Sequence, residues 1–215
     1  MSKKVSLKEI KKIWPEKAPD INNVQKYISK YEKEKIVIKY GGNVLIDRKV
    51  FDGFISDINV LNKLGFSIVV VHGGGPRIKR ELDKKKIVSK FINGLRVTDK
   101  NIIDTVEEVL IDFNNDIASS LKEIGSLAAS FHTKSYNVIE VEPEREELGF
   151  VGIPKNIDVS LIENALNKNE IPIIAPLGLD KNNQTYNING DTAANAIAKK
   201  LKARRLILMT NVEGV

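Results

Sequence analysis

The sequence predicts an α/β protein built around an open, mainly parallel sheet. Two short β-branched runs, 36–38 and 68–71, each end in a glycine turn, and a stretch of helical apolar spacing separates them. This order of strand, glycine turn, helix and strand is typical of a right-handed parallel crossover. A third turn, 187–195, opens directly into an alanine-rich helix. Because ligands bind at the carboxyl ends of strands in open α/β sheets, we expect the three turns to meet at one edge.

Two amphipathic helices are expected in residues 1–34, ahead of the first strand. Apolar residues recur at helical spacing over 7–14 and again over 21–31, and Asp20 can cap the second helix. We interpret this segment as a docking or oligomerisation arm. The alternative is a mitochondrial-type transit peptide, which the lack of arginine and the presence of Glu9 and Glu16 disfavour.

The later elements follow from apolar periodicity and from glycine positions. We expect further helices at 50–64, 102–124, 159–167 and 193–201, and further strands at 137–141, 171–174 and 206–209. The last of these strands reads as buried. A buried strand followed by a glycine turn normally leads into another element, so we expect the chain to be a piece of a longer protein.

Composition excludes several classes of chemistry. The 215 residues suffice for one substantial α/β domain, or for one domain and part of another. There is no cysteine, and His72 and His132 are too far apart in the sequence to suggest a zinc pair, so we expect no metal site of that kind. No apolar run approaches the ~20 residues of a membrane span, and no secretory signal opens the chain. We therefore expect a cytoplasmic protein without a membrane partner.

The net charge of +6 is concentrated at the start of the chain. Residues 1–35 hold ten lysines against five acids, and the remainder is nearly neutral. A nucleic-acid surface interleaves basic residues with aromatic or arginine readers on a folded face, whereas this segment is a lysine-rich lead-in. We expect no nucleic-acid partner. The opposite hypothesis predicts binding that depends steeply on salt.

Common nucleotide-binding fingerprints are absent. No glycine is followed by lysine, which excludes GxxxxGK[ST], and Ile78 stands where the third glycine of GxGxxG would be. The remaining possibility is a phosphate site made of glycine turns, whose backbone N–H groups approach an anion, together with lysine side chains. Lys39, at the exit of the first strand, fits such a site. A solvated strand end explains Lys39 equally well.

The other candidates also have a structural alternative. The triple glycine 73–75 can hold a carboxylate or phosphate on successive amides, or it is a tight turn. Arg96 can clamp a carboxylate with two parallel hydrogen bonds, or it is a surface arginine. Asp191 can be a ligand group or only a helix cap, and Asn187 and Asn189 can be turn formers.

Taken together, six segments resemble the acetylglutamate kinases of the amino acid kinase family. They are, in chain order, 37–43, 71–76, 93–98, 148–152, 187–194 and 210–215. The resemblance runs from about residue 35 to the end. Glycine turns of this kind are shared across the wider family, so the Asn-Gly-Leu-Arg-Val-Thr segment at 93–98 is the most discriminating.

The resemblance implies a three-layer α/β/α sandwich, the amino acid kinase fold. An N-terminal lobe, 35–202, would bind N-acetyl-L-glutamate, and 203–215 would begin an ATP-binding C-terminal lobe that is largely missing. The implied reaction is the ATP- and Mg²⁺-dependent phosphorylation of the acetylglutamate side-chain carboxylate in arginine biosynthesis. Because the family takes a second catalytic lysine from a later region, we expect the 215-residue form not to turn over.

The resemblance also implies roles by position. Lys39 would stabilise the transferring phosphoryl group, and Asp191 would orient the catalytic lysines. Gly74 and Gly75 would supply amides, while Arg96 and Asn187 would hold the acetylglutamate. The phosphate and nucleotide contacts would be Gly41, Gly42, Asn211, Val212, Glu213, Gly214 and Val215.

This chemistry needs no general base, because the nucleophile is a carboxylate that is already ionised near neutral pH. Lysines, glycine amides and Mg²⁺ would do the work of holding two anions in line. Ala129 and His132 stand where relatives usually carry glycines in a hairpin over the substrate, so that lid is expected to differ.

Two alternatives stay open at this point, another amino acid kinase such as an acetylaminoadipate kinase, and a noncatalytic acid-sensing or interaction domain. A homo-oligomer is expected, either a dimer or a hexamer joined through the N-terminal helix, with Ile21, Val24, Ile28 and Tyr31 as the contact stripe.

Overall fold

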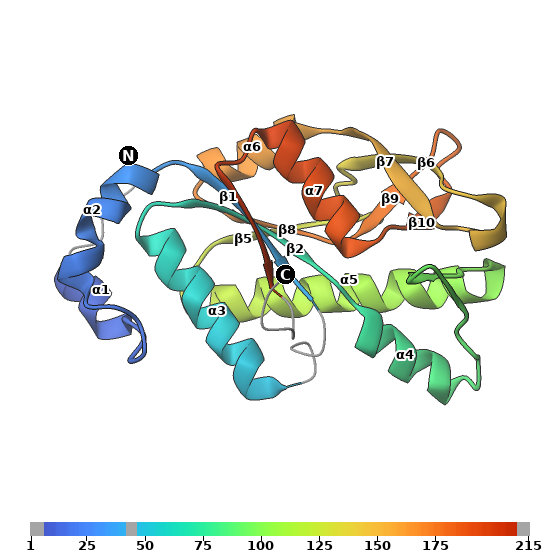
Figure 1. The fold of residues 1–215 in the computed structure, drawn as a ribbon, viewed down its shortest axis with the longest axis horizontal. Coiled ribbons are helices and arrows are strands. Elements are labelled where there is room, and N and C mark those ends of the chain that lie inside the picture. The colour runs from blue at the N-terminus through green and yellow to red at the C-terminus, as the bar shows by residue number, and fades with distance from the viewer. Residues whose placement is uncertain (1–6, 42–46, 210–215) are drawn as a thin grey trace.

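The protein is an α/β sandwich with a parallel sheet in its middle layer (Figure 1). The computed structural model describes residues 7–41 and 47–209. The helices are α1 (Leu7–Ile13), α2 (Ile21–Tyr31), α3 (Arg48–Lys63), α4 (Gly75–Lys84), α5 (Lys100–Glu123), α6 (Val159–Asn167) and α7 (Gly190–Leu201), with a 3₁₀ turn, η2, at Glu146–Leu148. The strands are β1 (Lys35–Tyr40), β2 (Ser67–His72), β3 (Phe91–Ile92), β4 (Leu95–Arg96), β5 (Ala128–Phe131), β6 (Ile139–Pro143), β7 (Gly152–Ile157), β8 (Ile171–Ile174), β9 (Leu177–Leu179), β10 (Thr185–Asn187) and β11 (Arg205–Met209).

The main sheet has five parallel strands in the order β11-β1-β2-β8-β5. Within it, Lys39 of β1 lies opposite Val71 of β2 and Leu208 of β11. The loops that follow β1 and β2 therefore leave the sheet side by side at its carboxyl edge. This is the edge at which the sequence places the ligand.

Two hydrophobic cores cover the two faces of this sheet, which makes the fold three-layered as expected. On one face, Ile36, Ile38 and their neighbours pack against α3 and α5. On the other face, Val37 and the alternate residues of β2 pack against α6 and α7. Alternation along each strand sends successive side chains to opposite cores, so a strand buried on both faces is apolar throughout. Figure 1 shows α3 and α5 on one side of the sheet and α6 and α7 on the other.

A second sheet of four strands, in the order β10-β9-β6-β7, extends the side that carries α6 and α7. β6 pairs with β7, and β9 with β10, in antiparallel fashion. Of these strands the sequence predicted only β6. It also did not predict α4, β5 or the β3–β4 hairpin. These are short segments whose apolar pattern is interrupted by glycine, proline or charged residues, and tertiary pairing decides their conformation.

The expected helices and strands of the main sandwich are confirmed, with one correction. β11 was read as a buried strand, but Ile207 and Leu208 are 43% and 50% exposed. Among the described strands β1 alone flanks β11, so β11 is an edge strand and its side chains lack a second neighbour. In the segment that was expected to differ from relatives, Ala129 lies within β5, paired with Pro172 of β8, and His132 directly follows this strand.

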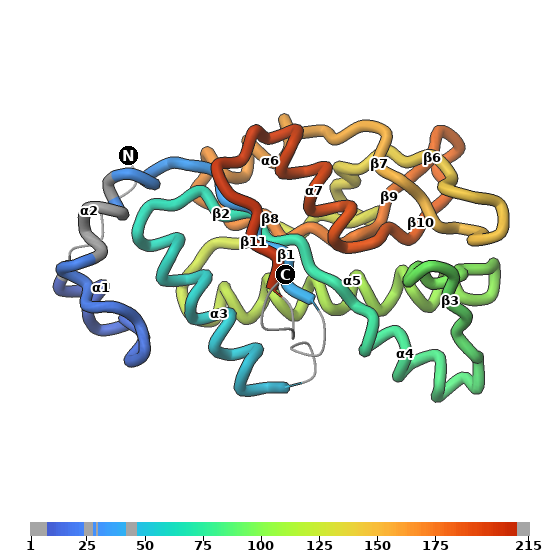
Figure 2. Tube along the Cα trace, viewed as in Figure 1, coloured from blue at the N-terminus to red at the C-terminus, as the bar shows by residue number. Residues whose placement is uncertain are grey.

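The N-terminal helices pack on α3 of the same chain. Ile10 and Ile21 form a small apolar cluster with Val60 and Leu64, and Ile28 lies against it. Asp20 caps α2, since its carboxylate accepts the Asn22 N–H at 2.7 Å, as predicted. Figure 2 shows α1 and α2 running alongside α3, away from the glycine loops. Oligomerisation through this arm and the division at residues 34 and 202 stay predictions. Among the described residues, no helix is both long and apolar enough to span a membrane.

Candidate functional site

The three glycine turns meet, as predicted. A Cβ placed on Gly73, after β2, would lie 3.5 Å from the Cα of Gly41, after β1. A Cβ placed on Gly190, at the start of α7, would lie 3.8 Å from the Cα of Gly73 and 3.4 Å from the Lys39 side chain. Segments almost 150 positions apart in the sequence are thus in contact. Glycines allow this approach because they carry no side chain between the backbones.

A cavity of about 240 Å³ opens where the turns meet. It is lined by Lys39, Gly73, Gly74, Gly75, Pro76, Ile78, Phe91, Gly94, Leu95, Arg96, Leu110, Val151, Pro176, Asn187, Ile188, Asn189, Gly190 and Asp191. Every residue predicted as catalytic or substrate-binding is in this lining. Gly41 lies outside it but against the Lys39 side chain. Gly42 and residues 211–215, predicted as phosphate and nucleotide contacts, lie outside the described residues.

Lys39 and Asp191 form an ion pair within the lining of the cavity. The Lys39 ammonium lies 2.9 Å from the Asp191 carboxylate, and the two side chains are 14% and 56% exposed. Lys39 is held by the sheet, because it is the fifth residue of β1 and is flanked by β2 and β11. The pair places a positive charge at the carboxyl edge of the sheet. Asp191 limits where that charge can move, which is compatible with the predicted orienting role.

Asn189, and not Asp191, caps helix α7. The Asn189 side-chain oxygen accepts the N–H groups of Asp191 and Thr192 at 2.9 and 3.0 Å. Asp191 sits in the first turn of the helix, where a carboxylate is favoured by the helix dipole. The cap alternative raised for Asp191 is therefore wrong. Its side chain is available for Lys39 because Asn189 satisfies the helix start.

Arg96 is a buried cation in the lining of the cavity. It is 8% exposed, and its Nη2 donates to the Gly75 carbonyl at 3.3 Å while its Nη1 donates to the Ser89 hydroxyl. Its guanidinium stacks 4.8 Å from the centre of the Phe91 ring. Burial lowers the pKa of Arg96 from its ordinary value, although an arginine stays charged near neutral pH. The surface-arginine alternative is excluded, because these contacts aim a buried guanidinium along the cavity wall.

Asn187, which lines the cavity, is linked to Arg96 by two hydrogen bonds through Thr98. Its amide donates to the hydroxyl of the fully buried Thr98 at 3.3 Å, and that hydroxyl donates to the Arg96 carbonyl at 3.0 Å. The backbone of Thr98 makes hydrogen bonds to both neighbours of Gly149: its N–H donates to the Leu148 carbonyl, and its carbonyl accepts the Phe150 N–H. The segments 93–98, 148–152 and 187–194 are therefore one hydrogen-bonded unit. The three motifs that were predicted separately form a single wall.

The cavity carries a net positive potential. Its lining includes two cations, Lys39 and Arg96, and one carboxylate, Asp191. Helix α4 starts at the same place, and its N-cap, Gly74, has no side chain to satisfy the first N–H groups. These N–H groups carry the positive end of the helix dipole. The site is therefore suited to a ligand with two or more negative charges.

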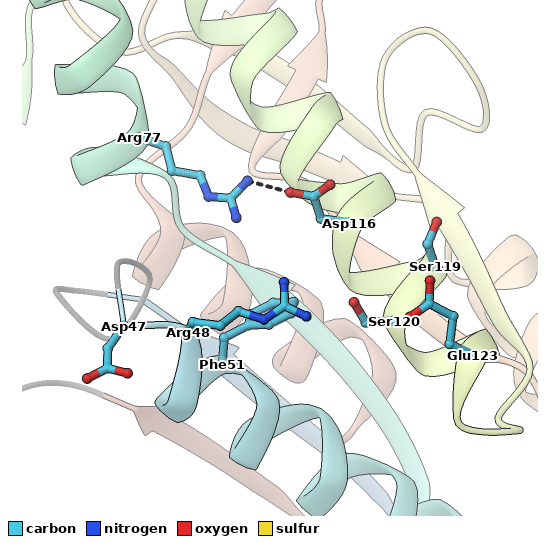
Figure 3. A pocket seen from close by; sticks show the side chains of 8 residues that line it. All are labelled: Asp47, Arg48, Phe51, Arg77, Asp116, Ser119, Ser120 and Glu123. Atoms are coloured by element: carbon cyan, nitrogen blue, oxygen red, sulfur yellow. Dashed lines mark hydrogen bonds and ion pairs between the residues drawn. The ribbon is translucent and has the colours of Figure 1, made fainter.

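A second cavity, of about 330 Å³, lies between the start of α3, the start of α4 and the C-terminal part of α5 (Figure 3). Its two arginines already have partners. Arg77 bonds Asp116 at 2.6 Å and stacks 4.0 Å from the Phe113 ring, and Arg48 pairs with Asp52 at 3.0 Å. It contains none of the predicted site residues. The smaller cavity, where cations and uncapped amides converge, is the better candidate despite its volume.

Several residues that support the site were not singled out from the sequence. Glu107 of α5 accepts the hydroxyls of Thr133 at 2.5 Å and Thr185 at 2.9 Å, and so holds β10 just before Asn187. Burial is the largest single effect on the pKa of Glu107 and acts to raise it. The hydrogen bonds from the two threonines and the nearby Lys134 ammonium together outweigh burial, so the pKa is lowered from its ordinary value. His72 and Asn114 are buried beneath the triple glycine. Contacts between residues this far apart leave no local signal in the sequence.

The sequence profile of the amino acid kinase family matches residues 34–215. The chain belongs to the amino acid kinase family. The acetylglutamate kinase of Pelagibacter ubique is 50% identical over 207 residues, which cover 96% of this chain and 72% of that protein. The acetylglutamate kinase of Roseobacter denitrificans is 42% identical, over 94% of this chain and 71% of that protein.

Solved structures give the same fold. The smu.665 protein of Streptococcus mutans UA159 superposes with a TM-score of 0.74 at 34% identity, over 84% of this chain and 74% of that one. N-acetylglutamate synthase of Neisseria gonorrhoeae superposes with a TM-score of 0.80 at 20% identity, over 90% of this chain and 45% of that one. At that identity the second match shows the fold alone. The family and the three-layer fold predicted from the motifs are thus confirmed.

Proposed function

We propose that this kinase transfers the γ-phosphoryl group of ATP to the side-chain carboxylate of N-acetyl-L-glutamate, as a step of arginine biosynthesis. Two relatives at 50% and 42% identity are named acetylglutamate kinase. The observation that carries the proposal is the cavity itself, whose lining brings together Lys39, Arg96 and the start of helix α4, where no side chain caps the first N–H groups. A cytoplasmic location belongs to the same proposal.

The two cations suit different ends of this substrate. N-acetylglutamate carries two carboxylates, and Arg96, with a planar guanidinium, suits recognition of the one that does not react. Asn187 on the same wall offers an amide that can be shared with the ligand. Lys39 lies at the other end, beside Gly190 and the glycine turns, where charge develops during transfer. In this arrangement the unreactive carboxylate of the substrate binds Arg96 and the reacting carboxylate lies next to Lys39.

The chemical step requires positioning rather than a base. A carboxylate oxygen of the substrate attacks the γ-phosphorus, a P–O bond forms, and the bond to the β-phosphate oxygen breaks to release ADP. No proton has to be removed, because the carboxylate is ionised. The N–H groups at Gly74 and Gly75 and the Lys39 ammonium would stabilise the oxygens of the transferring group.

ATP is the expected phosphoryl donor for this family, and we propose that Mg²⁺ accompanies it. Among the described residues there is no group of three acidic, histidine or cysteine side chains that could hold a metal ion. Mg²⁺ often binds through substrate phosphates and water rather than a protein cage. The ion would therefore arrive on the nucleotide and neutralise its β- and γ-oxygens.

Calorimetry on the 215-residue chain tests the substrate. N-acetyl-L-glutamate should bind more tightly than L-glutamate, whose free amine adds a positive charge to a site that already has two. A chain that is folded by circular dichroism yet gives no heat with N-acetyl-L-glutamate would overturn the proposal. Tighter binding of N-acetyl-L-2-aminoadipate would favour the acetylaminoadipate alternative. ADP release from the 215-residue chain that depends on N-acetyl-L-glutamate would exclude a noncatalytic acid sensor, and would also contradict the expectation that this form does not turn over.

We also propose that the protein is a homo-oligomer, with a dimer or a hexamer as the two candidates. The support for an oligomer is the family resemblance. Part of the N-terminal stripe already makes contacts within the chain, since Ile21 is buried against α3 and Tyr31 contacts Phe66 edge-on at 6.4 Å between ring centres. Light-scattering mass before and after deletion of residues 1–33 tests the role of this arm. An unchanged mass would reject it.

A further inference from the structure

His72 is a fully buried ionisable group near the site, and the proposed reaction leaves it without a role. It is the last residue of β2, it is 0% exposed, and it directly precedes the triple glycine. Its ring lies edge-on to Phe113, with 5.0 Å between ring centres. Desolvation by burial lowers its pKa to about 4, so the ring is neutral near pH 7. A neutral imidazole has one donor nitrogen and one acceptor nitrogen, and their neighbours decide which is which.

The surroundings allow one proton arrangement. Nδ1 lies 2.8 Å from the Gly73 carbonyl oxygen, which can only accept, so Nδ1 carries the proton. Nε2 lies 3.2 Å from Asn114 Nδ2, which also donates to the Ile173 carbonyl at 2.9 Å. The amide nitrogen of Asn114 therefore faces both groups, and Nε2 accepts. Asn114 holds the tautomer that lets His72 donate to Gly73.

This hydrogen bond fixes the plane of a peptide in the glycine turn. The Gly73 N–H donates to the Tyr40 carbonyl at 2.7 Å, and the Gly73 carbonyl accepts from His72, so Gly73 is held on both sides. The described chain has no cis peptide, and in a trans peptide the N–H of the next residue points opposite to the carbonyl. The Gly74 N–H therefore points away from the His72 ring. Gly74 is among the residues that line the cavity.

Without such a hold the turn would have several conformations. Glycine reaches both signs of φ at similar cost, and three in succession make a peptide flip inexpensive. None of the three has a side chain that could fix its own peptide planes. An external donor of fixed direction, anchored in the sheet and in α5, removes this freedom before a ligand arrives.

We propose that His72 is a positioning residue that orients the Gly73–Gly74 peptide so that the Gly74 N–H faces the anionic ligand of the cavity. Asn114 acts through His72 by keeping its Nδ1 protonated. The proposal rests on the proposed function for the identity of that ligand. The orientation of the peptide does not depend on it.

Two substitutions separate positioning from packing. In His72→Asn the side-chain nitrogen can occupy the place of Nδ1 and donate to Gly73, but the side chain is smaller and leaves a void. In His72→Gln the volume is closer to histidine, and the amide reaches only the place of Nε2, towards Asn114. A packing role predicts that the glutamine variant performs better in every measurement. The positioning role predicts the opposite order for ligand affinity.

The experiment has one readout with a ligand and one without. Calorimetry with N-acetyl-L-glutamate should show His72→Asn within about threefold of the parent chain and His72→Gln weaker by about tenfold or more, the loss of one charge-assisted hydrogen bond. The residual dipolar coupling of the Gly74 N–H bond, measured by NMR on the ligand-free protein, should match the parent in the asparagine variant and differ in the glutamine variant.

The outcomes decide the two proposals separately. A glutamine variant that keeps both the Gly74 coupling and the affinity overturns the role of His72. A parent chain that does not bind N-acetyl-L-glutamate, with the Gly74 coupling altered as expected in His72→Gln, overturns the proposed function and leaves the positioning role standing. Should the asparagine variant fail to fold, Asn114→Leu takes its place: it removes the donor to Nε2 together with an amide oxygen that has no partner, and it should alter the Gly74 coupling. An unchanged coupling in Asn114→Leu would reject the part assigned to Asn114.

Discussion

Gly149 offers a sharp test of how the cavity wall is built, through the change Gly149→Ala. Gly149 has φ 67° and ψ −125°, a conformation that is essentially restricted to glycine. A Cβ built there would lie 2.6 Å from the carbonyl oxygen of Thr98, whereas real Cβ atoms do not approach closer than 3.0 Å. The atom it meets is backbone, and that backbone is fixed by hydrogen bonds to Leu148 and Phe150. The wall must therefore shift to accept an alanine.

The expected cost can be set against a matched control, Gly125→Ala. Gly125 also has a positive φ, of 86°, but a Cβ there meets nothing within 4 Å. The control should lose about 1–2 kcal/mol from the conformational penalty alone. Gly149→Ala adds a collision and a displaced Thr98, and its loss should exceed about 3 kcal/mol. The difference between the two variants isolates the collision from the backbone preference.

Urea unfolding followed by circular dichroism measures both losses, provided that the slope m is unchanged. Because Thr98 accepts the Asn187 amide, Gly149→Ala should also weaken N-acetyl-L-glutamate binding in whatever protein stays folded, and Gly125→Ala should not. Equal stability losses in the two variants would refute the reasoning, since the contact at Thr98 would then carry no energy.

Three further predictions concern the site. Arg96→Lys should weaken acetylglutamate binding by calorimetry about tenfold or more, because an ammonium cannot make two parallel hydrogen bonds; unchanged affinity would reject the clamp. Asp191→Asn should strengthen acetylglutamate binding by up to about fivefold, because one negative charge leaves the cavity. The control Asp116→Asn removes the same charge from the other cavity and should leave the affinity unchanged. Weaker binding by Asp191→Asn would contradict the electrostatic argument. Stability should fall as the pH drops from 6.5 towards 4, by up to roughly 3 kcal/mol, because His72 takes up a proton in the unfolded chain at its ordinary pKa of 6.5 but in the folded chain only at about 4. Urea midpoints at pH 7 and pH 4.5 should differ less in His72→Gln than in the parent, and an equal difference would assign the pH effect to other groups.

Much of the site could be predicted because its parts lie where local signals are strong. Lys39 lies at the end of an apolar strand, the triple glycine follows a second strand, and the turn at 187–195 precedes a helix. Each is therefore at the boundary of an element that apolar periodicity predicts. Arg96 was singled out by the resemblance of the motif at 93–98 to the acetylglutamate kinases, because on its own it fitted a surface arginine as well. The phosphate contacts predicted at Gly42 and 211–215 stay predictions, as do the roles assigned to the individual residues of the cavity.

The sequence by itself determined most helices and strands of the main sandwich in their order, the edge at which the turns meet and the kinds of groups found there. Apolar periodicity and glycine positions are local properties, and they can be read over ten residues. Only the tertiary structure decided that Asn189 caps α7 and leaves Asp191 for Lys39, that β11 lies at the edge of the sheet formed by the described residues, and that a second sheet supports Asn187. It also brought Asn114 within hydrogen-bonding distance of His72, 42 positions away in the sequence. Such contacts are set by how the layers pack, and a buried polar group takes whichever partner that packing brings within hydrogen-bonding distance.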